Sequence, residues 1–169
     1  MNPDLPTRRF LLGALSFGGI AAFLGAGGGN AAAVQGQGRF PVTLADAEWR
    51  RRLSPQAYSV LRRGSTERAG SSPLDREHRR GTFHCAGCAQ PLFSSAAKFE
   101  SGTGWPSFHS PIRAAIGTRP DNGLFGSRTE VHCSRCGGHL GHVFDDGPRP
   151  TGLRYCMNGA ALRFRPARA

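Results

Sequence analysis

Lysine is nearly absent from this sequence of 169 residues, because Lys98 is the only one. Arginine therefore supplies almost all of the formal net charge of +11 and the isoelectric point near 11.1. A charge of this size attracts anionic surfaces in general, such as nucleic acid, anionic lipid or an acidic protein. It does not choose among them.

Cysteine is also sparse, with five residues in the chain and none before Cys85. The length is about that of one domain that can bury a hydrophobic core, so a scaffold held by disulfides alone is not required. The lack of an early cysteine excludes lipid attachment at the N-terminal segment. We predict one domain over residues 43–169, preceded by a linker at 34–42.

The sequence has no long, strongly apolar run. Its nearest approach extends from Phe10 to about Ala26 and is diluted by glycines, so it is a poor permanent membrane span. Arg8 and Arg9 precede this stretch, and small residues follow it. The pattern resembles a twin-arginine signal, which exports folded proteins. We expect residues 1–33 to direct export to the periplasm or another extracytoplasmic space, with an uncleaved membrane anchor as the alternative.

The start of the domain carries signals for two short helices. Thr43 is predicted to cap a helix over residues 44–52, and Ser54 to cap a second helix with Pro55 at its first position. The residues predicted to form the buried stripe are Leu53, Tyr58 and Leu61.

From residue 81 onward, short apolar runs alternate with Gly, Pro and Asp, as in GTFHC, PLFSS and GLFGSRTEVHC. Short runs between turn residues favour antiparallel strands over long helices. Residues 68–80 show no sustained apolar period and predict a surface loop. The predicted fold class is mainly β, with a short helical N-terminal segment.

Four of the five cysteines form two CxxC pairs, in HCAGC and HCSRC. A CxxC turn presents two thiolates to one side, and two such turns complete the four-sulfur tetrahedron that zinc favours in structural sites. We predict one structural zinc ion, held by Cys85, Cys88, Cys133 and Cys136. The alternative is a pair of disulfides, which an oxidising compartment permits.

Cys156, in TGLRYCMN, is left without an obvious partner. A free cysteine is often just a small buried hydrophobe. However, Arg154 and Asn158 share its strand face if the segment is extended, and a nearby guanidinium favours the nucleophilic thiolate. His139 and His142 precede it and could bind metal, lie on the surface or act as acid–base partners of the thiol.

Five motifs, CAGC, SGTGWPSF, RTEVHCSRC, HLGHVFDDGP and TGLRYCMN, together resemble the methionine-R-sulfoxide reductases, the B class of methionine sulfoxide reductases. The likeness extends from about Leu44 to Phe164. It implies a β fold of two antiparallel sheets, with the zinc site remote from the active site.

The resemblance also implies roles for individual residues. Cys156 would be the nucleophile that attacks the sulfoxide sulfur and becomes a sulfenic acid. Trp105 would form the aromatic wall that receives the substrate methyl group. The other polar positions of the family's active site correspond to His139, His142, Asp146, Arg154 and Asn158. The substrates would be oxidised proteins that carry methionine-R-sulfoxide.

Three positions depart from the family pattern. Thr103 stands where many relatives carry a second, resolving cysteine, which implies an external reductant such as a thioredoxin-like protein or a small thiol. Gly70 and Gly126 stand where a phenylalanine and a methionine are expected, which would widen the substrate pocket. We expect a monomer that binds no nucleic acid. The competing hypothesis, a basic zinc-ribbon module that binds nucleic acid, explains the charge but not Cys156.

Overall fold

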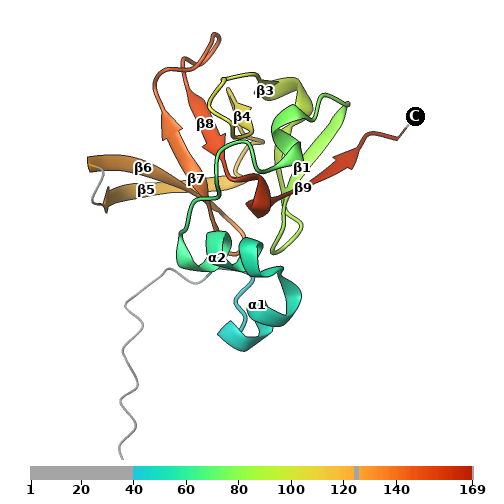
Figure 1. Ribbon diagram of the computed structural model, residues 1–169, viewed down its shortest axis with the longest axis vertical. Coiled ribbons are helices and arrows are strands. Elements are labelled where there is room, and N and C mark those ends of the chain that lie inside the picture. Colours follow the sequence, from blue (N-terminus) through green and yellow to red (C-terminus); the bar gives the residue numbers. More distant parts are fainter. Residues whose placement is uncertain (1–39, 124–125, 169) are drawn as a thin grey trace, which may run out of the picture. The chain divides into compact units, whose positions relative to one another are not determined.

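Two antiparallel sheets make up most of the structure, a computed structural model that describes residues 40–123 and 126–168 (Figure 1). The smaller sheet has the order β2-β1-β9, with β1 at Gly81–Cys85, β2 at Pro91–Ser94 and β9 at Leu162–Pro166. The larger sheet has the order β3-β4-β8-β7-β6-β5. Its strands are β3 (Lys98–Phe99), β4 (Ser107–Phe108), β5 (Ile116–Gly123), β6 (Gly126–Cys133), β7 (His139–Phe144) and β8 (Arg154–Met157). The predicted fold class is confirmed. The expected export signal lies outside the described residues.

The two helices come before the sheets in the chain and pack beside them. α1 spans Asp46–Arg52 and α2 spans Pro55–Arg63, and α2 contacts β7. Ser54 caps α2 as predicted, because its Oγ accepts a hydrogen bond from the backbone N–H of Ala57 at 3.2 Å. Within the described part of the chain, neither helix is long and apolar enough to cross a membrane.

Thr43 does not cap α1. The helix begins at Asp46, and its N-cap residue Ala45 makes no side-chain hydrogen bond. The Thr43 hydroxyl donates instead to the carbonyl oxygen of Phe40 at 3.0 Å. The prediction of a Thr43 cap for a helix starting at Leu44 is therefore wrong, because that hydroxyl binds the backbone upstream of the helix.

The hydrophobic core lies between the helices and the two sheets. Phe93 and Phe108 stack with ring centroids 4.3 Å apart, and Phe83 meets Phe108 edge-on at 4.9 Å. All three rings are fully buried. The predicted stripe of Leu53, Tyr58 and Leu61 is buried as well. Residues 68–80 contain one 3₁₀ turn, η1 at Pro73–Arg76, and no buried residue, which confirms the surface loop.

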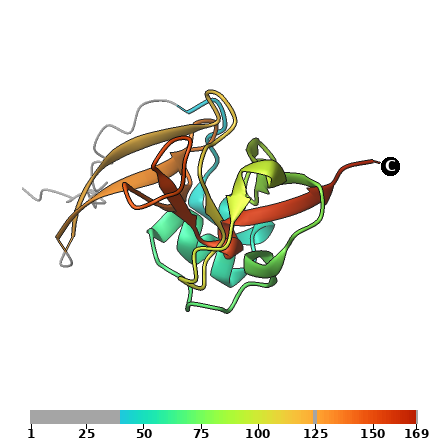
Figure 2. The same cartoon turned by 90° about the horizontal axis from the view of Figure 1, so that it is seen from above.

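The chain passes from the larger sheet to the smaller one through a single short turn. β8 ends at Met157, the 3₁₀ turn η3 spans Gly159–Ala161, and β9 follows at once. Figure 2 shows the larger sheet to the left and β9 extending to the right. β8, which carries Cys156, is an inner strand between β4 and β7, so its neighbours on both sides are fixed by backbone hydrogen bonds.

The two hydroxyl positions allow a matched test of helix capping. Ser54→Ala should lower the free energy of unfolding by about 1 kcal/mol, because the N–H of Ala57 loses its acceptor. Thr43→Ala should lower it by less than about 0.5 kcal/mol, since that residue caps no helix. Urea denaturation of both variants makes the comparison. Equal losses would contradict the assignment of the caps.

Candidate active site and metal centre

The two CxxC pairs converge where the sheets meet. Cys85 ends β1 and Cys133 ends β6, and each is followed by a turn that carries the second cysteine of its pair. The sulfur atoms of Cys85 and Cys136 are 3.7 Å apart, and those of Cys88 and Cys133 are 3.5 Å apart. All four sulfur atoms lie within 4.8 Å of one another. The predicted convergence of the four cysteines is confirmed.

This arrangement suits a metal ion better than disulfides. A zinc tetrahedron with Zn–S bonds of about 2.3 Å has sulfur–sulfur edges of about 3.8 Å, whereas a disulfide bond is about 2.05 Å long. Hydrogen bonds with the neighbouring thiols, Cys133 first, raise the pKa of Cys85 and of Cys136. Four thiolates this close would repel one another, and a bound cation would offset that repulsion. The donor set fits one zinc ion.

Cys156 lies in the larger sheet, outside this cluster, and is half-buried. Its register neighbours are Ser107 on β4 and His142 on β7. Burial raises the pKa of the Cys156 thiol, and contacts with Thr103, Arg154 and Ser107 act in the opposite direction without cancelling that effect. The guanidinium of Arg154 thus favours the thiolate, as expected from the sequence, but the resting form of the group is the thiol.

A cavity of about 130 Å³ opens beside Cys156. Its lining consists of Thr66, Trp105, Arg128, Gly141, His142, Phe144, Cys156 and Asn158. Trp105 and Phe144 provide aromatic surface, whereas Arg128, His142 and Asn158 provide polar groups. The indole N–H of Trp105 donates to the carbonyl oxygen of Glu67 at 3.1 Å, which fixes the ring. At about 30 Å³ for each water-sized group, the cavity holds roughly four such groups.

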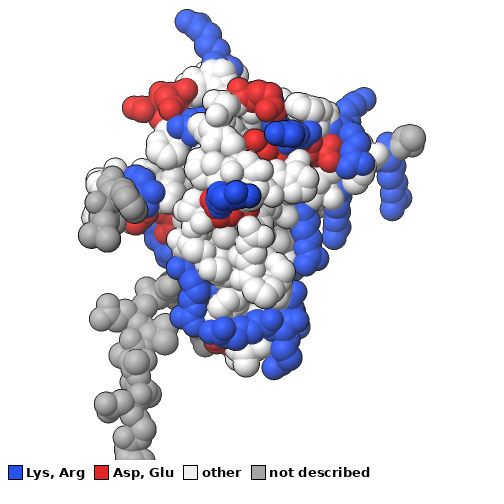
Figure 3. Space-filling model, in the orientation of Figure 1, with Lys and Arg blue, Asp and Glu red and all other residues white. Residues whose placement is uncertain are grey.

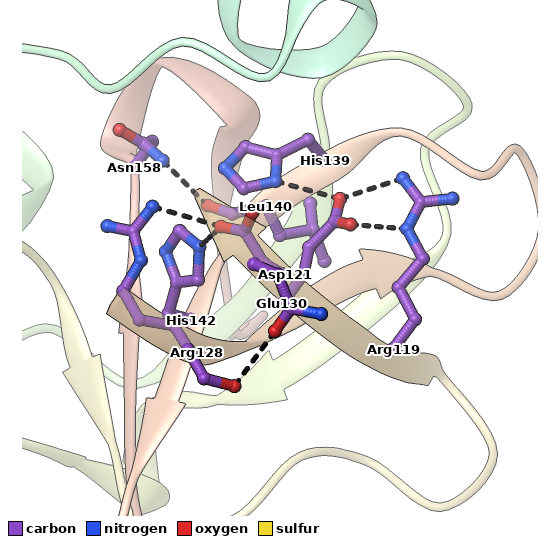
Figure 4. A network of polar contacts seen from close by, with 10 residues as sticks. Arg119, Asp121, Arg128, Glu130, His139, Leu140, His142 and Asn158 are labelled. Carbon is purple, nitrogen blue, oxygen red and sulfur yellow. Dashed lines mark hydrogen bonds and ion pairs between the residues drawn. The ribbon is translucent and has the colours of Figure 1, made fainter. Parts of the chain in front are cut away.

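His142 belongs to a polar network on the same face of the sheet (Figure 4). Its Nε2–H donates to the carboxylate of Asp121 at 2.7 Å, and Arg128 binds the same oxygen at 2.9 Å. Burial lowers the pKa of His142, although the hydrogen bond to Asp121 acts to raise it. The ring is therefore neutral near pH 7, with Nδ1 as its free acceptor position.

His139 lies one step behind His142. In a regular strand, residues three apart point to opposite faces, but an irregularity in the β6–β7 register brings the two rings to a centroid separation of 5.3 Å. His139 Nδ1 donates to Glu130 at 2.9 Å. Burial acts to raise the pKa of Glu130, but its hydrogen bonds from His139 and Arg119 outweigh this and hold it at about 2. Of the two histidines, only His142 lines the cavity at Cys156.

The remaining predicted polar residues differ in their relation to the cavity. Asp146 is exposed and binds the Arg154 guanidinium through two hydrogen bonds of 2.8 and 2.7 Å, and neither residue lines the cavity. Asn158 does line it, with both ends of its amide held. Its Nδ2 donates to the carbonyl oxygen of Leu140 at 3.0 Å, and its Oδ1 accepts from the backbone N–H of Glu67 at 2.9 Å.

Several residues of the site were not anticipated from the sequence. They are Thr66, Glu67, Asp121, Arg128, Glu130 and Phe144. In the segments 119–121 (RPD) and 128–130 (RTE), the two charged residues are two positions apart and so point to the same face of their strand. Oppositely charged residues of the two segments are paired across the β5–β6 hairpin. This pattern could have placed Asp121 and Glu130 on one face. Gly70 and Gly126 were expected to widen the pocket, but neither lines it.

A half-buried cysteine beside an aromatic cavity, set apart from a four-cysteine cluster that fits a metal ion, is the arrangement expected of a thiol enzyme with a separate structural site. Figure 3 shows basic side chains spread over one face with acidic ones among them, so charge alone marks no nucleic-acid site there. Comparison with known proteins identifies the kind of thiol enzyme.

Residues 53–166 match the SelR domain. The chain is 55% identical over 122 residues to the peptide methionine sulfoxide reductase MsrB of Thiobacillus denitrificans, covering 72% of this chain and 92% of the relative. It is 52% identical over 126 residues to that of Bradyrhizobium diazoefficiens (74% and 91%) and 48% identical over 127 residues to that of Leptospira interrogans (75% and 97%). The chain belongs to the SelR-domain family of peptide methionine sulfoxide reductases, which confirms the resemblance read from its motifs.

Removal of one cluster thiol should release the metal. Purified protein should contain about one zinc ion per chain, and Cys133→Ser should lose it together with several degrees of thermal stability, because a buried ligand set is left incomplete. Cys156→Ser is the matched control and should keep both, since Cys156 lies outside the cluster. Elemental analysis and thermal unfolding make the comparison. A metal-free wild-type protein, or an unaffected Cys133→Ser variant, would rule out this metal centre.

Proposed function

We propose that this protein reduces the R epimer of methionine sulfoxide in oxidised proteins to methionine, with Cys156 as the nucleophile. The observation that carries the proposal is the position of Cys156 in a small cavity that both aromatic and polar side chains line. The names of the family's curated relatives support the same substrate class. A cavity of about 130 Å³ suits the methylsulfinyl end of a side chain, which has three non-hydrogen atoms, together with the adjacent methylene group.

The chemistry is a transfer of oxygen from sulfur to sulfur. The Cys156 sulfur attacks the sulfoxide sulfur and forms a sulfur–sulfur bond, while the sulfur–oxygen bond of the substrate breaks and the protonated oxygen leaves as water. A water molecule then attacks the Cys156 sulfur and breaks the sulfur–sulfur bond, which releases methionine and leaves Cys156 as a sulfenic acid, so the net change is transfer of one oxygen. The departing oxygen needs a proton. The thiol form of Cys156, favoured by burial, can supply that proton itself, and His142 is the acid–base group placed to carry it.

The other polar residues would support this step without touching the reacting atoms. Asp146 holds Arg154, whose charge stabilises the thiolate as it forms, and Asn158 keeps one wall of the cavity in place. His139 would act through His142 rather than directly, because it faces Glu130. We include in the proposal a water molecule that Asp146 and Arg154 would hold in place and that would carry the proton from His142 to the sulfoxide oxygen.

Selectivity for one epimer would follow from the two kinds of wall. A methyl group placed against Trp105 leaves the sulfoxide oxygen toward the polar groups, whereas the opposite epimer exchanges the two positions. The zinc ion would be structural, held by the four clustered cysteines at a distance from the chemistry. We further propose that the protein acts outside the cytoplasm, a proposal that depends on residues 1–33 alone.

The substrate proposal predicts a strict preference. Purified protein should reduce the R epimer of a peptide methionine sulfoxide and leave the S epimer essentially untouched, as measured by chromatography that resolves the epimers. Cys156→Ser should abolish turnover while circular dichroism stays unchanged. Trp105→Ala should lower kcat/KM at least tenfold, because the methyl group loses its aromatic contact. Comparable rates on both epimers would refute the proposal.

Regeneration should need an external thiol. Cys85, Cys88, Cys133 and Cys136 belong to the metal cluster, so no internal thiol remains to attack the sulfenic acid. A single turnover without reductant should yield one methionine per chain and a sulfenic acid that dimedone traps, with zinc retained. A thioredoxin-like protein or a small thiol should then restore the thiol.

The same experiment has a constructive control. Thr103 Oγ1 lies 3.8 Å from the Cys156 sulfur, so Thr103→Cys should form an internal disulfide after turnover and lose dimedone labelling. A wild-type disulfide between Cys156 and a cluster cysteine, seen by mass spectrometry together with zinc loss, would disprove the external-reductant scheme.

A further inference from the structure

We propose that a chain of three hydroxyl groups, Ser107, Ser101 and Thr103, stabilises the Cys156 thiolate by reversing the direction of its hydrogen bonds when the thiol loses its proton. The proposal rests on the function proposed above and assigns Thr103 a direct part in it. Thr103 is then a hydrogen-bond partner of the reacting sulfur.

The chain is continuous from the sulfur to a backbone carbonyl. Thr103 Oγ1 is 3.8 Å from the sulfur of Cys156 and 2.8 Å from the hydroxyl of Ser101. The Ser101 hydroxyl is 2.7 Å from that of Ser107, which donates to the carbonyl oxygen of Trp105 at 3.1 Å. Ser107 is 1% exposed, so water does not readily replace its partners.

Counting protons fixes the direction of every bond in the resting state. Each hydroxyl carries one proton, and a carbonyl oxygen only accepts. Because Ser107 donates to the carbonyl of Trp105, Ser101 must donate to Ser107, and Thr103 must donate to Ser101. The Thr103 oxygen is then left to accept the S–H of Cys156. In this direction the chain stabilises the thiol.

Loss of the thiol proton demands the opposite direction. A thiolate can only accept, so Thr103 turns its O–H to the sulfur, Ser101 turns to Thr103, and Ser107 turns to Ser101. Three O–H groups rotate and no proton passes between residues, because the proton of Cys156 leaves to the sulfoxide oxygen or to an external base. The carbonyl of Trp105 loses one donor, and the sulfur gains a charge-assisted hydrogen bond, which is the stronger of the two.

The other groups that face Cys156 differ from the hydroxyl chain, because they are charged or titratable side chains. Arg154 on its own strand and Arg128 on β6 are permanently charged, and His142 on β7 is neutral near pH 7. β4 contributes only Ser107, a member of the chain. Thr103 and Ser107 are the neutral hydroxyl groups that act on the sulfur, and both act to lower the pKa of Cys156. Thr103 makes the hydrogen bond of 3.8 Å, whose direction can follow the protonation state of the sulfur.

The test uses a conservative pair at Thr103 and needs no substrate. Zinc-bound full-length protein is alkylated with iodoacetamide over a range of pH, and modification of Cys156 is followed by peptide mass spectrometry. Thr103→Val, which keeps the shape and removes the hydroxyl, should slow alkylation near pH 7 about tenfold and move the midpoint of the pH profile upward. Thr103→Ser should restore the wild-type profile.

Two further variants guard the interpretation. Ser101→Ala should not move the profile upward as Thr103→Val does, because the Thr103 O–H then has no competing acceptor in the chain and Ser107 keeps its bond to the carbonyl of Trp105. Thr129→Val, at an exposed position on β6, should leave the profile unchanged. If Thr103→Val does not fold, Thr103→Ala, which also removes the hydroxyl, decides.

An unchanged profile in Thr103→Val would overturn the proposal, as would an equal shift in Thr103→Val and Thr103→Ser, or an upward shift in Ser101→Ala as large as that in Thr103→Val. Because alkylation requires no sulfoxide, a failed chain of hydroxyls can be distinguished from a failed function. A protein that shows the shift but reduces no sulfoxide refutes only the function.

Discussion

The four-cysteine cluster is the contact that holds the two sheets together at one end. It joins the end of β1 in the smaller sheet to the end of β6 in the larger one. A direct hydrogen bond adds to this junction, since Gln90 donates to Ser134 at 2.8 Å. Arg62 of α2 donates to the carbonyl oxygen of Cys136 at 3.0 Å, which ties the helix to the cluster. The helices and both sheets therefore enclose one core, and the turn from β8 to β9 connects the two sheets.

The same cluster decides the chemistry available elsewhere. Four thiols lie in the cluster, so Cys156 is the one cysteine outside it. Cys156 is held on an inner strand, so its neighbours on β4 and β7 are determined by register, while Thr103 contacts it from a loop. Permanent charge, a neutral imidazole and hydroxyl groups then surround a thiol that burial keeps protonated at rest. Under the proposed function, the thiolate would form only as the reaction requires it.

Local patterns in the sequence predicted the parts that depend on local physics. The Ser54 cap, the buried face of α2 and the strand-rich C-terminal part all follow from residue types over a few positions. The CxxC pairs predicted the cluster because two such turns together supply the four sulfur ligands of one tetrahedral metal site. The prediction of a Thr43 helix cap failed because a Ser or Thr hydroxyl binds whichever backbone group lies near it. Here that group is the carbonyl oxygen of Phe40, which depends on the course of the chain before the helix.

The remaining parts of the site depend on contacts between segments distant in sequence. The irregularity that aligns His139 with His142, the pairing of Asp121 with His142, and the contact of Glu67 with Trp105 arise only after the strands are in register.

We propose that Cys156 is the single reactive thiol and that the other four cysteines hold a metal. The decisive measurement is a titration of the zinc-bound protein with a thiol reagent, in which the modified residue is mapped and activity is followed. One equivalent should react, at Cys156, with complete loss of activity and no loss of zinc. Modification of a cluster cysteine first, or activity that survives a blocked Cys156, would contradict it.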